Sequence, residues 1–117
     1  MRRIYLGLIG LLLCTSLYAY DGISNQILSG RQTVTTAGTR VQLSTADIAV
    51  AKVVITAETD NTGYVVVGSG DVVATVLTRV GIPLNAGESI VICVNNLNKV
   101  YLDSTVNTDG VTWMAYK

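Results

Sequence analysis

The residues that could do chemistry in this sequence are few, and they gather at two neighbouring turns. Asp60 and Asn61 open a polar turn at residues 60–63, and Asp71 follows a Gly-Ser-Gly corner at residues 68–70. Carboxylate and amide oxygens can ligate calcium, but this spacing lacks the fixed ligand order of a calcium loop. The corner also lacks the Lys-Ser/Thr pair and the following helix of a phosphate-binding loop. Turn formation explains these residues better, so we expect no metal and no cofactor.

Catalysis is disfavoured by residue types as well as by spacing. The sequence contains no His, which removes the usual base of a hydrolytic triad and the imidazole ligands of many metal sites. Cys93 stands in a Val/Ile-rich run at residues 89–95, where we expect a buried, structural side chain. A nucleophile there would need a neighbouring base that the sequence does not offer. We therefore expect no catalytic residue and no enzymatic activity.

Four aromatic residues form the candidate interaction surface. They lie on predicted strands or at their ends: Tyr64, Tyr101, Trp113 and Tyr116. Such rings could line a sugar-binding face, but aromatic residues on a β-sandwich more often belong to the core or to subunit contacts. We favour the second interpretation.

The overall charge disfavours nucleic acid as a partner. Lys and Arg together number 8, as do Asp and Glu, and the net charge is zero. Binding to nucleic acid depends on clustered basic residues that release counterions from phosphates, and no such cluster is present.

The N-terminal residues 1–19 form a hydrophobic leader. Arg2 and Arg3 precede an apolar stretch at residues 4–14, and the small residue Ala19 suits cleavage by signal peptidase. Leu17 suits that cleavage site poorly, and residues 4–20 are nearly long enough to span a bilayer as a helix. Residues 1–19 are therefore either a signal peptide or a membrane anchor. Residues 20–31 are polar and unpatterned, as in a linker or an extended arm.

The pattern from residue 32 to residue 117 is typical of strands and tight turns. Apolar residues alternate at residues 49–57, Val100 and Leu102 should face inward, and Tyr101 and Asp103 should face outward. We predict further strands at residues 64–67 and 72–78, whereas residues 81–88 contain the only Pro and should not form a central strand. About eight short antiparallel strands predict an all-β fold, a single jelly-roll-like β-sandwich behind an N-terminal hydrophobic helix.

Three motifs in order carry a resemblance. Residues 61–68 read N-x-G-x-V-x-V-G, residues 81–89 read G-x-x-L-x-x-G-E-S, and residues 97–103 read L-x-x-V-Y-L-D. In this order, over residues 39–117, the sequence resembles small structural proteins of tailed phages and related viruses.

The resemblance implies a virion structural protein without enzymatic activity. It would be a minor capsid, decoration, head-fibre, vertex or spike component, commonly multimeric, that contacts other capsid proteins and copies of itself. Residues 1–19 are unusual for such proteins. They would anchor this one in a viral membrane, or else the chain is an exported bacterial surface sandwich, secreted or at the cell surface, that acts as an adhesive or carbohydrate-binding module.

Overall fold

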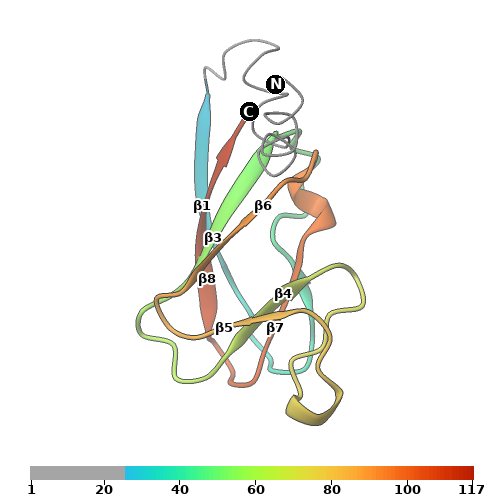
Figure 1. Cartoon of the computed structure of the whole chain (residues 1–117), viewed down its shortest axis with the longest axis vertical. Helices are drawn as coiled ribbons and strands as arrows, with labels where there is room; N and C mark the ends of the chain where they lie inside the picture. Colours follow the sequence, from blue (N-terminus) through green and yellow to red (C-terminus); the bar gives the residue numbers. More distant parts are fainter. Residues whose placement is uncertain (1–25) are drawn as a thin grey trace, which may run out of the picture.

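The computed structural model describes residues 26–117, which form two four-stranded antiparallel sheets (Figure 1). Along the first sheet the strands are β1 (Ile27–Thr33), β8 (Gly110–Tyr116), β3 (Lys52–Ala57) and β6 (Ser89–Ile92). Along the second sheet they are β2 (Val41–Gln42), β7 (Tyr101–Ser104), β4 (Val65–Gly68) and β5 (Ile82–Leu84). Two single-turn 3₁₀ helices, η1 (Val76–Thr78) and η2 (Leu97–Lys99), interrupt the loops.

The strand pairing is that of a jelly roll. β1 pairs with β8, β2 with β7, β3 with β6 and β4 with β5. The first four strands therefore pair with the last four in reverse order, and each half of the chain contributes two strands to each sheet. An eight-stranded double sheet built in this way is the jelly-roll architecture. The predicted all-β, jelly-roll-like sandwich is confirmed. The predicted N-terminal helix and residues 1–19 lie outside the described residues.

The main core lies between the two sheets and follows the predicted alternation. Val53, Ile55 and Ala57 of β3 are buried on the inner face of the first sheet, as the period of two required. Val100 and Leu102 are also buried, which confirms the inward face predicted for the segment that contains β7.

The structure corrects two boundaries along the chain. β1 begins at Ile27, so the end of the predicted linker at residues 20–31 belongs to the first sheet. Residues 72–78, predicted as a strand, instead form a loop with η1 near its tip, and the strand β5 follows at Ile82–Leu84. β5 lies at the edge of the second sheet, which agrees with the exclusion of this Pro-containing segment from a central position.

A small second core lies on the outer face of the second sheet. Val66 lies between the inward-facing Val65 and Val67 of β4, so its side chain points outward. It packs with Val72 and Ala74, and Tyr101 packs against this cluster. The long β4–β5 connection therefore folds over the sheet. This cover explains why Val72 and Ala74 are apolar without forming a strand, whereas residues 75–78 lie beyond it and are exposed.

Candidate functional site

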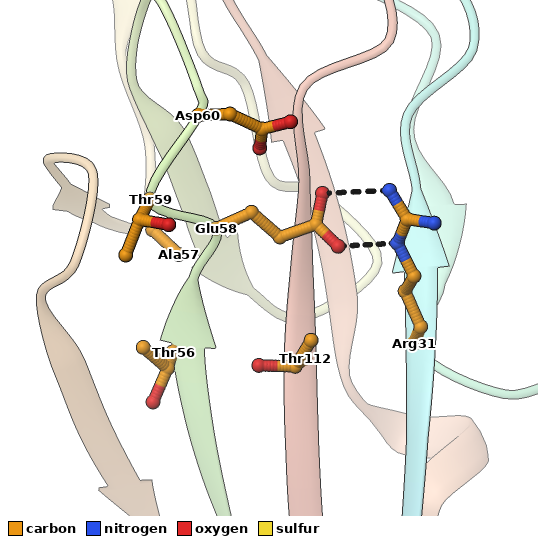
Figure 2. A pocket seen from close by; sticks show the side chains of 7 residues that line it. All are labelled: Arg31, Thr56, Ala57, Glu58, Thr59, Asp60 and Thr112. Atoms are coloured by element: carbon orange, nitrogen blue, oxygen red, sulfur yellow. Dashed lines mark hydrogen bonds and ion pairs between the residues drawn. The ribbon is translucent and has the colours of Figure 1, made fainter.

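A pocket lies at one end of the first sheet's outer face (Figure 2). Arg31 of β1, Thr112 of β8 and Thr56 of β3 share one row across the sheet. Glu58, Thr59 and Asp60 follow the end of β3 and border this row on one side of the pocket. The shallow cavity measures about 430 Å³, and six of the seven residues that line it carry a hydroxyl or a charged group.

An ion pair occupies the pocket. Arg31 approaches the Glu58 carboxylate with two donors, Nε and Nη2, and Nη2 donates to Oε1 over 3.1 Å. The Glu58 side chain is only 9% exposed, whereas that of Arg31 is 64% exposed. Hydrogen bonding to Glu58, and then the charge of its carboxylate, raise the pKa of the Arg31 guanidinium above its usual value. Both oxygens of the Glu58 carboxylate therefore accept hydrogen bonds from Arg31. Because neither oxygen is left for a substrate proton, the pocket suits polar contacts better than proton transfer.

The structure does not bring the four predicted interaction residues together. Tyr64, which is 39% exposed, precedes β4 and lies with its ring 5.0 Å from the guanidinium carbon of Arg79. Tyr116 lies on the outer face of the first sheet, with the Lys52 ammonium 5.0 Å from its ring. Tyr101 lies against the small second core on the other sheet.

Trp113 faces the main core and not a binding surface. Its Cα pairs with that of Gly30, and a side-chain carbon added at Gly30 would stand 2.5 Å from the indole ring. The indole packs against the core cluster, and its Nε1 is buried without a hydrogen-bond partner. Gly30 thus makes room for the ring, and Trp113 cannot stack on a ligand from this position.

The turn residues considered as calcium ligands make hydrogen bonds that stabilise the fold. The Asn61 side chain donates to the Gly110 carbonyl over 2.9 Å and accepts from the Gly110 amide over 3.0 Å, as a paired strand would. Asp71 accepts a hydrogen bond from the Ser69 hydroxyl over 2.6 Å. Among the residues that the structure describes, no group of three or more His, Cys, Asp or Glu could hold a metal ion.

Two buried aspartates, Asp103 and Asp109, accept hydrogen bonds from the backbone of loops. The sequence did not indicate either of them as a site residue. Asp103, predicted to face solvent, is 2% exposed because loops cover the outer face of the second sheet. Its carboxylate accepts backbone hydrogen bonds from Gly38 (2.9 Å), Ala74 (2.9 Å) and Ser104 (2.8 Å). The Asp109 carboxylate accepts from the amides of Thr62 and Gly63.

The three motifs therefore consist largely of structural residues. Asn61 and Asp103 bond backbone groups far away in sequence, and Gly81 adopts a φ of 122° with Val66 and Val67 closely packed around it. In the middle motif, the Glu88 carboxylate accepts from the Asn85 amide over 2.7 Å and closes the turn before β6. These motifs specify turns and loop attachments of the jelly roll, and they do not form a ligand site.

Cys93 departs from its predicted environment. It follows the last residue of β6, Ile92, and its side chain is exposed, not buried. The register that pairs Val53 with Ile92 puts the next pair, Lys52 and Cys93, on the outer face of the first sheet. The outward direction of Cys93 follows from the alternation that points Ile90 and Ile92 toward the core.

Comparison with known proteins finds no match to this chain among protein-family models, curated proteins or solved structures. Within residues 26–117, no helix is long and apolar enough to cross a membrane.

Proposed function

We propose that this chain is a structural component of a virus particle, associated with the capsid and without catalytic activity. The observation that carries the proposal is the jelly-roll strand order, in which four pairs join the first half of the chain to the second. Viral capsid domains use this architecture. The ordered motifs at residues 61–103 resemble those of small phage structural proteins and support the same proposal.

Carbohydrate binding is the second candidate, because lectin domains share the architecture. The polar pocket around Arg31 and Asp60 would be the binding site of an exported adhesive module. Sugar sites usually include an aromatic ring for stacking, yet no aromatic residue lines this pocket and Trp113 faces the core. The distribution of the aromatic residues therefore favours the virion component over the carbohydrate-binding module.

Self-association would use the outer face of the first sheet. Met114 and Val54 are neighbours in one row of that face, Val91 stands opposite Val54, and Ile27 stands in the next row. Ile27 is 65% exposed, Val91 56% and Met114 39%, so an apolar band crosses this face of the sheet. Two copies related by a two-fold axis would each contribute the same band, as homo-oligomers commonly do.

The hydrophobic leader would give this virion component its membrane attachment. Residues 1–19 would hold the chain in a viral membrane, and the sandwich would contact the capsid proteins beside that membrane. Zero net charge and the lack of a basic cluster agree with protein partners and no nucleic acid.

The test is co-purification with particles. Particles from the producing host are separated on a density gradient, and each fraction is assayed for the chain by mass spectrometry and for the major shell protein. We expect the two profiles to coincide, and detergent to release the chain if residues 1–19 hold it in lipid. A chain that stays at the top of the gradient would refute the proposal. Binding of the purified full chain to a glycan array, lost on replacing Asp60 by Ala, would favour the second candidate.

A further inference from the structure

The connection between β4 and β5 projects from the second sheet as a narrow hairpin, called here the η1 hairpin (residues 73–80). At its base the Val73 amide donates to the Val80 carbonyl, and the Val80 amide donates to the Val73 carbonyl, both over 3.0 Å. Between these two residues the chain forms η1, in which the Thr78 amide donates to the Thr75 carbonyl over 3.1 Å. Paired hydrogen bonds at the base and a closed turn at the tip give the hairpin a defined shape.

Further contacts attach the hairpin to the sandwich. The Arg79 guanidinium donates from Nε and Nη2 to the Ala74 carbonyl, each over 3.1 Å, and lies beside the Tyr64 ring. The Asp103 carboxylate accepts from the Ala74 amide, and the Ala74 side chain is buried in the second core. The sandwich therefore holds the hairpin at its base and along one side.

The tip of the hairpin is apolar and exposed. Leu77 is 93% exposed and Val76 is 67% exposed, and nearby Val80 and Ile82 are 43% and 51% exposed. A Leu that is almost fully exposed contributes little to the stability of its own fold, because its apolar surface remains in water. A group of exposed apolar side chains on a projecting, well-attached hairpin marks an interaction site.

We propose that Val76 and Leu77 insert into an apolar recess of a different protein of the particle. This inference rests on the proposed function, and it assigns the tip to the contact between this chain and a capsid protein. Projecting apolar side chains that fill a partner's pocket are typical of the few residues that dominate the energy of an interface.

A lipid surface fits the tip less well. The two side chains bury less hydrocarbon than a single myristoyl chain, which by itself holds a protein on a membrane only marginally. Arg79 is the one charged residue between residues 72 and 84, and its guanidinium is bonded to Ala74 and stacked beside Tyr64. A polar partner for lipid phosphates is therefore missing beside the apolar tip.

A second copy of this chain also fits less well. The pocket described above is lined by Arg31, Glu58 and Asp60, so that pocket is too polar to receive Leu77. Contact between two convex tips would bury little surface, and a stable interface buries about 800 Å² on each partner. In β5 beside the tip, Pro83 has no amide to donate, which disfavours edge-to-edge pairing with another strand.

The position of the tip agrees with a partner on the far side of the domain. Figure 1 shows the start of β1 and the end of β8 at one end of the sandwich, and η1 near the other end. Residues 1–25 join the domain at the start of β1. A sandwich attached to a membrane through that junction would present Val76 and Leu77 away from the attachment.

The test compares incorporation of full-length variants into particles. Leu77→Asp should fold with an unchanged melting temperature, because residue 77 is almost fully exposed, while its incorporation falls by about tenfold or more. The control, Val106→Asp, changes a Val that is 36% exposed in the β7–β8 loop; with a melting temperature equal to that of the wild type, it should be incorporated like the wild type.

The outcomes separate this inference from the proposed function. Wild-type chain in particles, together with normal incorporation of Leu77→Asp, would overturn the inference and leave the function standing. A wild-type chain missing from particles would overturn both. A photoreactive residue at position 77 identifies the partner: a crosslink to another particle protein supports the inference, whereas a crosslink to the same chain or to lipid overturns it.

Discussion

Replacing Asp103 by Asn should loosen the η1 hairpin and lower the stability of the whole domain. The carboxylate of Asp103 accepts three backbone hydrogen bonds: Oδ1 from Gly38 and Ser104, and Oδ2 from Ala74. An Asn side chain has only one acceptor oxygen, and its NH₂ group must face at least one of these amides. The substitution therefore preserves the shape of the side chain and removes a specific interaction.

The expected magnitude follows from the number of donors left without an acceptor. In the less costly orientation the Asn oxygen keeps Gly38 and Ser104, and only the buried Ala74 amide loses its partner. One buried donor without a partner costs about 1 to 3 kcal/mol. Asp103→Ala leaves all three donors without the carboxylate, and we expect it to lower the free energy of unfolding by about 3 to 6 kcal/mol.

Chemical denaturation measures the global effect, and amide hydrogen exchange localises it. Asp103→Asn should speed exchange at Ala74 more than at core amides such as Ile55. Asp71→Asn serves as the control, because Asp71 accepts from the Ser69 hydroxyl in an exposed contact, and its unfolding free energy should change by less than about 0.5 kcal/mol. If Asp103→Asn is as stable as the control and exchange at Ala74 stays unchanged, the structural role of the third motif is refuted.

Three further predictions address packing and the leader. Gly30→Ala should lower the unfolding free energy by about 1 to 3 kcal/mol because the added carbon would stand 2.5 Å from the Trp113 ring, whereas Gly70→Ala, with 3.6 Å to the nearest atom, should be close to neutral; equal stability of the two variants would contradict this. Trp113→Phe should cost far less than Trp113→Ala, because it removes a buried N–H without a partner while keeping most of the ring, whereas Trp113→Ala should cost about 3 to 5 kcal/mol; a Phe variant as unstable as the Ala variant would contradict this. The intact mass of the native chain should include residues 1–19 and appear in the lipid-containing fraction, whereas a mass that lacks those residues would indicate cleavage and export.

The fold could be predicted from sequence where one face of a strand is buried. Val53, Ile55 and Ala57 alternate with more polar neighbours, and that period of two identifies the core face of β3. The start of β1 was missed because Ser29, Gly30 and Arg31 show no such pattern. β1 forms at the edge of the sheet by pairing with β8, and a partner so distant in sequence leaves no local signal.

Errors elsewhere come from contacts between distant segments. Val72 and Ala74 resemble strand residues, yet they cover the outer face of the second sheet beside Val66. The same cover buries Asp103, which alternation alone directs toward solvent. Exposure of Leu77 is likewise a property of the folded chain, so the η1 hairpin could not be selected as an interaction surface from residue types.

The residues of the candidate pocket could not be predicted from the sequence either. Arg31 and Glu58 are brought together by the β1–β8–β3 arrangement, although they are distant in the chain. By contrast, Asp71 accepts from Ser69 within its own turn, as the preference of Asx residues for turns predicts, whereas the Asn61 side chain pairs with the distant Gly110 backbone.

The copy number of this chain in purified particles decides whether it is a virion component. Quantitative mass spectrometry with isotope-labelled peptides gives the molar ratio of the chain to the major shell protein. We expect a fixed ratio, the same from preparation to preparation and set by the symmetry of the shell. A chain that is missing from purified particles, or whose ratio varies as that of a contaminant does, would contradict the proposed function.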